Sequence, residues 1–215
     1  MLFVGSLQRL DDEGQWTGIF KSLVDAPLLL GIHGLAGDVQ ADRRVHGGPE
    51  KAIHHYPANS YSALAARFPA ISEQLIPGSI GENISAAGWD ERSVCLGDIF
   101  SLDGTRLQVS QPRSPCWKID HRYATPGVAR HISETGLTGW YYRVLETGMV
   151  RTGSTLQLLD RLPTAVTLAE LWSICCEHRP DPAQLLRISQ SSRLNSAWRQ
   201  KLLDRVEWLR KNACA

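Results

Sequence analysis

The chain has 215 residues, of which 43% are hydrophobic and 21% are charged, and its formal net charge at pH 7 is +1. This length and composition are typical of a soluble globular protein with one sizeable domain and a small addition. The near-neutral charge balance indicates neither nucleic acid nor a membrane as a partner, so an anion site must come from a local cluster of cations and backbone N–H groups.

Residues 1–7 predict a first strand rather than a signal peptide, because the apolar run is short and no basic residue precedes it. No stretch approaches the roughly 18 apolar residues that a membrane span needs. The cysteines are odd in number and match no disulfide framework or zinc pattern; they are Cys95, Cys116, Cys175, Cys176 and Cys214. We therefore expect reduced thiols and a cytoplasmic location.

Short segments broken by glycine and proline fill residues 1–162. Residues 107–110 alternate apolar and polar side chains, as a half-buried strand does. Further strands are expected at residues 94–100, 140–145 and 156–159, and helices at residues 58–68 and 128–135. Many short strands with few helices predict a mainly β (α+β) fold built on a closed or partly closed β-barrel.

The character of the sequence changes near Pro163. Thr167 and Glu170 have the spacing of a capping box, which predicts the start of a helix. Asp181 and Pro182 predict a second helix start, and a third helix follows Asn195, with one apolar stripe made by Trp198, Leu202, Val206 and Leu209. We therefore predict a barrel domain at residues 1–162 and a three-helix domain at residues 163–215, because short amphipathic helices need a packing partner.

Cys116 lies in the stretch Gln111-Pro112-Arg113-Ser114-Pro115-Cys116-Trp117-Lys118, directly after a predicted strand. The two prolines leave the backbone few alternatives. Arg113 and Lys118 favour the thiolate, which is the form that binds metals or attacks electrophiles. A lone cysteine is ordinarily a small buried hydrophobe, but the rigid, cationic surroundings favour a functional thiol here.

A second polar stretch covers residues 37–52. Gly47 and Gly48 allow the backbone to approach a ligand closely. The stretch also carries side chains suited to a phosphate or a polar ring, namely Arg43, Arg44, His46 and Lys51. Asp38 and Asp42 can orient those bases or accept hydrogen bonds themselves. A polar surface turn is the alternative interpretation.

Two shorter patterns complete the set of candidates. Gly81-Glu82-Asn83 follows another glycine-containing turn and can bind an anion or read a heterocycle, although a simple β-turn explains it equally well. His54 and His55 are neighbours and face apart in a helix or a strand, so one of them is expected to be structural.

Together these stretches resemble the MOSC domain, which is named after the C-terminal domain of molybdenum cofactor sulfurases. The resemblance rests on Asp38-x-Gln-x-Asp42-x-x-x-His46-Gly47-Gly48, on Gly81-Glu82-Asn83, on Gln111-Pro112-Arg113-x-Pro115-Cys116 and on the Gly-Trp pair near residue 140. It covers nearly the whole chain with the order of the motifs preserved. It points to the bacterial YiiM-like branch, in which a three-helix domain follows a MOSC-type β-barrel.

This resemblance implies a reductase that uses the molybdenum cofactor, a molybdopterin, with Cys116 as the protein ligand of the metal. Substrates implied for this branch are N-hydroxylated compounds such as N-hydroxylaminopurines and amidoximes, whose reduction detoxifies base analogues. Electrons would come from a separate flavin or iron–sulfur reductase, since no four-cysteine ferredoxin pattern is present. No pyridoxal phosphate is expected, because the aminotransferase-like domain of the fused relatives is missing.

We assign Cys116 and His46 to catalysis, with His46 as the proton donor because histidine titrates near neutrality. The predicted cofactor-binding residues are Arg44, Gly47, Gly48, Lys51, Gly81, Glu82, Asn83, Gln111, Arg113 and Lys118. Two alternatives remain open: sulfur transfer through a persulfide on Cys116, and a non-catalytic cofactor carrier. A homodimer is a candidate assembly, and the C-terminal helices are expected to cover the barrel, form that dimer or dock the reductase.

Overall fold

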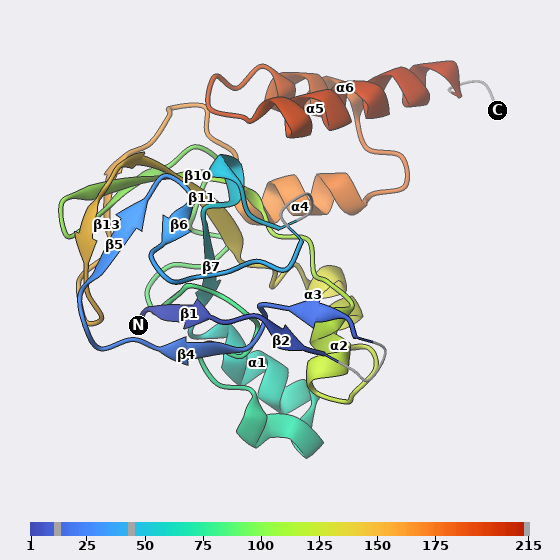
Figure 1. Cartoon of the computed structure of the whole chain (residues 1–215). Coiled ribbons are helices and arrows are strands. Elements are labelled where there is room, and N and C mark those ends of the chain that lie inside the picture. The colour runs from blue at the N-terminus through green and yellow to red at the C-terminus, as the bar shows by residue number, and fades with distance from the viewer. Residues whose placement is uncertain (11–13, 43–45, 213–215) are drawn as a thin grey trace.

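The computed structural model describes residues 1–10, 14–42 and 46–212. Its largest element is a six-stranded sheet that curls into half a barrel (Figure 1). In spatial order, its strands are β13 (Gln157–Asp160), β9 (Ile99–Leu102), β10 (Thr105–Pro112), β11 (Trp140–Glu146), β7 (Ile53–Pro57) and β8 (Ile84–Ala86). Neighbouring strands are antiparallel except β7 and β8, which run parallel.

Shorter strands complete the β-structure. They form a three-stranded sheet of β12 (Gly148–Val150), β5 (Leu28–Gly31) and β6 (Gly34–Leu35), a pair of β1 (Phe3–Gly5) and β4 (Lys21–Leu23), and a hairpin of β2 (Gln8–Arg9) and β3 (Trp16–Thr17). Side chains from the six-stranded and three-stranded sheets share one apolar core, which includes Leu30, Ile53, Phe100, Leu107 and Tyr142. The alternating pattern predicted at residues 107–110 thus belongs to a strand at the centre of the fold.

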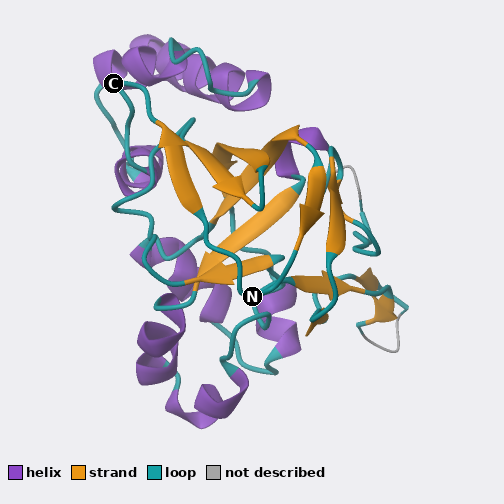
Figure 2. Ribbon diagram, turned by 90° about the vertical axis from the view of Figure 1, so that its left-hand side faces the viewer, coloured by secondary structure: helices purple, strands orange, loops and turns teal. Residues whose placement is uncertain are grey.

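Helices pack at two ends of this β-structure (Figure 2). One group comprises α1 (Ser60–Arg67), η2 (Pro69–Gln74), α2 (Lys118–Arg122) and α3 (Val128–Thr135), whereas the short helix η1 (Pro49–Lys51) lies apart from it, against β10 and β11. A second apolar cluster, with Leu64, Ile80, Ile119 and Ile132 at its centre, joins α1, α2 and α3. The helices predicted at residues 58–68 and 128–135 are confirmed, whereas α2, directly after Cys116, was not predicted.

The C-terminal segment folds into α4 (Leu168–Cys176), α5 (Pro182–Ser189) and α6 (Ser196–Lys211), and Figure 1 shows α5 and α6 side by side. The predicted caps are confirmed: Thr167 and Glu170 form a capping box, and Asp181 and Asn195 cap α5 and α6 with their side chains. The helices bury a third apolar cluster together with Leu96 of the β-structure. Among the described helices, none is both long and apolar enough to cross a bilayer.

The segment at residues 94–100 differs from its prediction as one strand. Only its end joins β9, because the chain turns at Gly97, whose φ is +81°. Asp98 holds this turn: its buried carboxylate accepts hydrogen bonds from Cys95 N at 2.8 Å and from Arg161 Nε and Nη2 at 2.8 and 2.6 Å. A buried carboxylate without such partners would be strongly destabilising.

Replacing Arg161 with alanine should therefore lower the free energy of unfolding by about 3 kcal/mol, because it leaves Asp98 buried and unpaired. Urea unfolding followed by circular dichroism measures this change. Arg106→Ala is the matched control, since its ion pair with Glu146 is about half exposed, at 52% and 53%, and should cost at most about 1 kcal/mol. Equal losses in the two variants would contradict the assignment.

Candidate functional site

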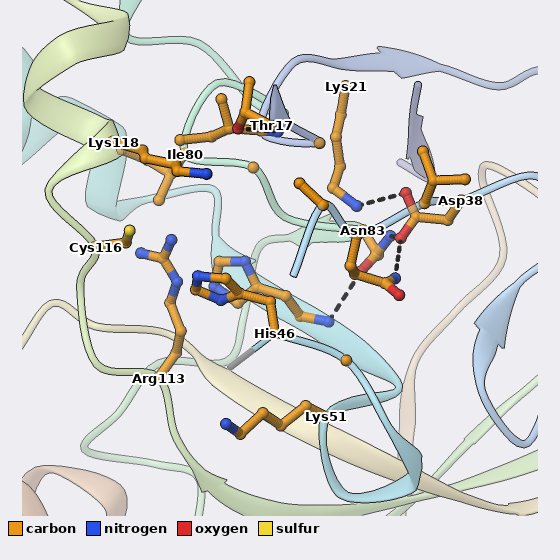
Figure 3. A pocket seen from close by; sticks show the side chains of 18 of the residues that line it. Thr17, Lys21, Asp38, His46, Lys51, Ile80, Asn83, Arg113, Cys116 and Lys118 are labelled. Carbon is orange, nitrogen blue, oxygen red and sulfur yellow. Dashed lines mark hydrogen bonds and ion pairs between the residues drawn. The ribbon is translucent and has the colours of Figure 1, made fainter. Parts of the chain in front are cut away.

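Chain segments that are far apart in the sequence enclose a pocket of about 620 Å³, counting the space open to solvent. They are the turn between β3 and β4, the loop before η1, the start of β7, the turn before β8 and the loop after β10. The polar lining consists of Thr17, Lys21, Asp38, Gln40, His46, Lys51, His54, Asn83, Arg113, Cys116, Lys118 and Tyr141 (Figure 3).

Asp38 organises one side of the pocket. Its Oδ1 accepts hydrogen bonds from Lys21 Nζ at 2.6 Å and from Gly5 N at 2.8 Å, and its Oδ2 accepts from Asn83 Nδ2 at 2.9 Å and from Gln40 Nε2 at 3.1 Å. The two charged side chains are nearly inaccessible, at 6% for Lys21 and 2% for Asp38. Burial lowers the pKa of Lys21, and the charge of Asp38 opposes this shift.

Cys116 lies on the other side of the pocket, with Arg113 and Lys118 (Figure 3). Arg113 is only 5% exposed, and its Nη1 has no hydrogen-bond partner within the described part of the chain. Lys118 Nζ donates to the carbonyl oxygen of Trp16 at 2.7 Å and keeps further N–H groups for another acceptor. A buried guanidinium with one unpartnered nitrogen next to a thiol is the feature expected of a site for an anionic group.

His46 and His54 face the same cationic surroundings. Burial first, and then the charges of Arg113, Lys51 and Lys118, lower the pKa of His46 to about 4. Burial and the charge of Arg113 hold the pKa of His54 well below its ordinary value. Both rings are therefore neutral at pH 7, so the ordinary titration range from which we predicted a proton donor at His46 does not apply to this pocket.

Two of the predicted glycines let the backbone approach closely. Gly47 has a φ of +94°, and a Cβ there would lie 2.8 Å from Gln40 Oε1. Gly81 has a φ of +87°, and a Cβ there would lie 2.9 Å from a side-chain carbon of Ile19. Both glycines line the pocket, so a larger residue at either position would strain the chain and fill the pocket wall.

The structure brings together eight of the predicted residues at this pocket, namely His46, Gly47, Lys51, Gly81, Asn83, Arg113, Cys116 and Lys118. Gly48, Glu82 and Gln111 are not among the lining residues. Arg44 lies outside the described residues. The predicted loops therefore meet at one pocket, but not every predicted side chain turns into it.

Glu82 turns away from the pocket. It is fully buried, and its Oε1 accepts hydrogen bonds from Tyr61 Oη and Gly78 N, each at 2.6 Å. Burial raises its pKa. Asn83 does line the pocket, but its side-chain amide forms hydrogen bonds within the protein. Its Nδ2 donates to Asp38 and to Phe3 O, and its Oδ1 accepts from His54 N at 3.1 Å. Both residues thus brace the turn before β8.

Sequence reasoning did not single out Lys21 or Ile80 as pocket residues. Burial raises the pKa of the Tyr141 phenol, and the neighbouring Arg113 opposes this shift. His54 lines the pocket, whereas His55 Nδ1 lies 3.2 Å from Tyr142 Oη in the core, so the two histidines face apart as predicted. Among the described residues, no group of three or more His, Cys, Asp or Glu side chains is placed to hold a metal ion.

A family model described as the MOSC domain matches residues 42–157, which include the loops of His46, Gly81 and Cys116. The YiiM protein of Escherichia coli strain K12 is 36% identical over 204 residues, covering 95% of this chain and 90% of that protein. The chain belongs to the MOSC-domain family. The resemblance inferred from the motifs is therefore confirmed.

Solved structures of this MOSC branch share the fold. Crystal structures of YiiM from Geobacillus stearothermophilus and from Escherichia coli match with TM-scores of 0.81 and 0.79, at 30% and 32% identity. The matches cover 95% and 97% of this chain, and 96% and 94% of those chains. A protein of Gibberella moniliformis named "Reductase" is 36% identical over 146 residues, which are 67% of this chain but 26% of that protein.

The neutral state of His46 predicts a pH dependence of stability. The unfolded chain binds a proton at this histidine near pH 6.5, whereas the folded chain does so only near pH 4. Stability therefore falls as the pH drops from 6.5 towards 4, by up to about 1.4 kcal/mol per pH unit from this residue. His46→Gln should flatten that slope in urea unfolding at several pH values, while His54 and His55 contribute equally to both proteins. Identical slopes would refute the shift.

Proposed function

We propose that this protein binds the molybdenum cofactor with Cys116 as the ligand of the metal, and that it reduces N-hydroxylated compounds. The observation that supports this most is the pairing of a pocket-facing thiol with a buried Arg113 guanidinium whose Nη1 lacks a partner among the described residues. MOSC domains are associated with molybdenum cofactor binding, and one relative carries the name "Reductase".

The residues present fit such a group. The phosphate and dithiolene groups of a molybdopterin are anionic, and such groups are bound by cationic side chains and backbone N–H donors. The donors would be Arg113, Lys118 and Lys51, together with the backbone exposed at Gly47 and Gly81. Asp38 is the one carboxylate among the described lining residues, and both of its oxygens already accept hydrogen bonds from protein groups.

Reduction of an N-hydroxylated compound breaks its N–O bond and consumes two electrons and two protons, giving the amine and water. When bound, the cofactor would supply a metal that cycles between oxidation states two electrons apart, a chemistry that thiolate and dithiolene sulfurs suit. Arg113 and Lys118 would stabilise negative charge beside Cys116. His46 would hold its proton on one ring nitrogen as a neutral imidazole, and would become a stronger proton carrier once an anion offsets the cations that lower its pKa.

Electrons would arrive from a separate flavin or iron–sulfur reductase.

Apolar residues of the pocket would limit the access of water: Ile80 is fully buried and Ile19 is 9% exposed, and both line the pocket. Arg122 Nη1 donates to Ile19 O at 2.7 Å, which fastens this wall to α2. The wall and Cys116 are thus held by one short helix.

Cys116→Ala should abolish molybdenum binding, because it removes the proposed protein ligand. The protein would be made with molybdate in a host that synthesises the cofactor, and its metal content measured by inductively coupled plasma mass spectrometry. Cys176→Ala is the matched control, since Cys176 is an exposed free thiol outside this pocket, and should keep the wild-type content. Wild-type protein loaded with metal should then reduce an amidoxime when a donor is supplied.

Three outcomes would count against this proposal. Equal molybdenum in wild type and Cys116→Ala would remove Cys116 as the ligand. A sulfur adduct on Cys116 in freshly purified protein without molybdenum would favour persulfide transfer. A loaded protein that reduces no N-hydroxylated compound with any donor would favour a carrier.

Arg113→Met should weaken cofactor retention with little change of volume. Losing a charge-assisted hydrogen bond costs about 1.5–3 kcal/mol, or roughly 10- to 150-fold in affinity. The measurement is the molybdenum remaining after extended dialysis. Arg130→Met serves as the control, because its side chain is 80% exposed and lies outside the pocket. Equal retention in both variants would show that the buried guanidinium does not hold the anion.

A further inference from the structure

Asn195 joins the start of α6 to the strand that leads to Cys116. Its Oδ1 accepts a hydrogen bond from Trp198 N at 2.8 Å, which caps the helix. Its Nδ2 donates to Gln111 Oε1 at 3.0 Å and lies 3.3 Å from Ser110 O. The side chain is 5% exposed, and Gln111 is 8% exposed. One buried amide therefore caps a C-terminal helix and binds the end of β10.

The segment beyond Gln111 has little freedom to absorb a displacement. Pro112 and Pro115 fix two of its φ angles, and Arg113 N donates to Gly139 O at 3.1 Å. Cys116 O accepts from Ile119 N at 3.0 Å, at the start of α2. A shift of Gln111 is thus expected to reach the thiol through a stiff loop rather than to be lost in a mobile one.

The same junction also reaches the loop of Lys51. Ser110 Oγ lies within hydrogen-bond distance of the carbonyl oxygens of Glu50 and Tyr141. Glu50 precedes Lys51, and Tyr141 lines the pocket together with Lys51 and Arg113. The end of β10 therefore connects α6 with three residues that line the pocket.

We propose that Asn195 is a positioning residue for Cys116. Through its contact with Gln111, the position of α6 sets the position of the thiol in the pocket. The inference rests on the proposed function only in taking Cys116 as the functional thiol. Gln111, which we predicted as a cofactor contact, serves here as the acceptor that transmits the position of α6.

Asn195→Ser tests this role, because serine keeps an N-cap oxygen but cannot donate to Gln111. The measurement is the rate at which iodoacetamide alkylates Cys116 in cofactor-free protein between pH 6 and 9, with the modified peptide identified by mass spectrometry. We expect at least a threefold change of rate at pH 7 or a displaced pH midpoint, with a small change of melting temperature. An unchanged rate profile overturns the proposal.

Two comparisons separate positioning from general loss of stability. Asp181→Ala removes the cap of α5, in which the exposed Asp181 carboxylate accepts a hydrogen bond from Ala183 N at 2.8 Å. This variant should lower the melting temperature without changing Cys116 alkylation. Gln111→Ala should change the rate of Cys116 alkylation as Asn195→Ser does. The double variant should show no larger change of this rate than either single variant. Additive effects contradict the proposal. Since alkylation needs no molybdenum, this result is independent of the metal analysis.

Discussion

The buried carboxylate of Asp38 is the constraint on which the pocket depends. Its four donors come from β1, from β4, from the loop that carries it and from the turn before β8. A buried carboxylate is stable only when paired and hydrogen-bonded, so these segments must meet for the protein to fold. The meeting point is also one wall of the pocket. Burial of this one carboxylate thus brings together segments that are distant in the sequence, and these segments form the pocket wall.

Because the Asp38 carboxylate is already bound by its four protein donors, the pocket keeps a surplus of positive charge. The charge of Lys21 is offset by Asp38, but no second carboxylate among the described residues lines the side that holds Arg113 and Lys118. Burial first, and then this surplus of positive charge, lower the pKa of His46. An anionic ligand would relieve the imbalance, and this is the physical reason for placing an anionic cofactor here rather than a neutral one.

The sequence predicted the loops of the pocket better than it predicted their side-chain directions. The His46 and Cys116 motifs were found because glycine and proline act locally on the backbone. Whether a polar side chain in those motifs enters the pocket depends on partners elsewhere in the chain. Glu82 accepts a hydrogen bond from Tyr61, and Gln111 accepts one from Asn195, so neither side chain lines the pocket. Such contacts have no local signature.

The sequence missed other features for the same reason, namely that no local pattern marks them. Lys21 lies on a short strand without a motif, and only its contact with Asp38, 17 residues away, gives it a role. The helix α2 was not predicted because its 5 residues are too few for a periodic apolar pattern. By contrast, the caps of α4, α5 and α6 were predicted correctly, since an N-cap side chain bonds a backbone group two or three residues away.

Two C-terminal helices are connected by hydrogen bonds to the chain segments that carry the pocket. Besides Asn195 at the start of α6, the first turn of α4 is bound by Ala169 N donating to Glu91 O at 2.7 Å. The carboxylate of Glu91 accepts from Gly139 N at 2.6 Å, and Gly139 O accepts from Arg113 N. Each helix is thus a short series of hydrogen bonds away from the loop of Cys116. The change of sequence character near residue 163 therefore does not coincide with a break in the hydrogen-bond network, and movement of these helices would alter the backbone that presents the thiol.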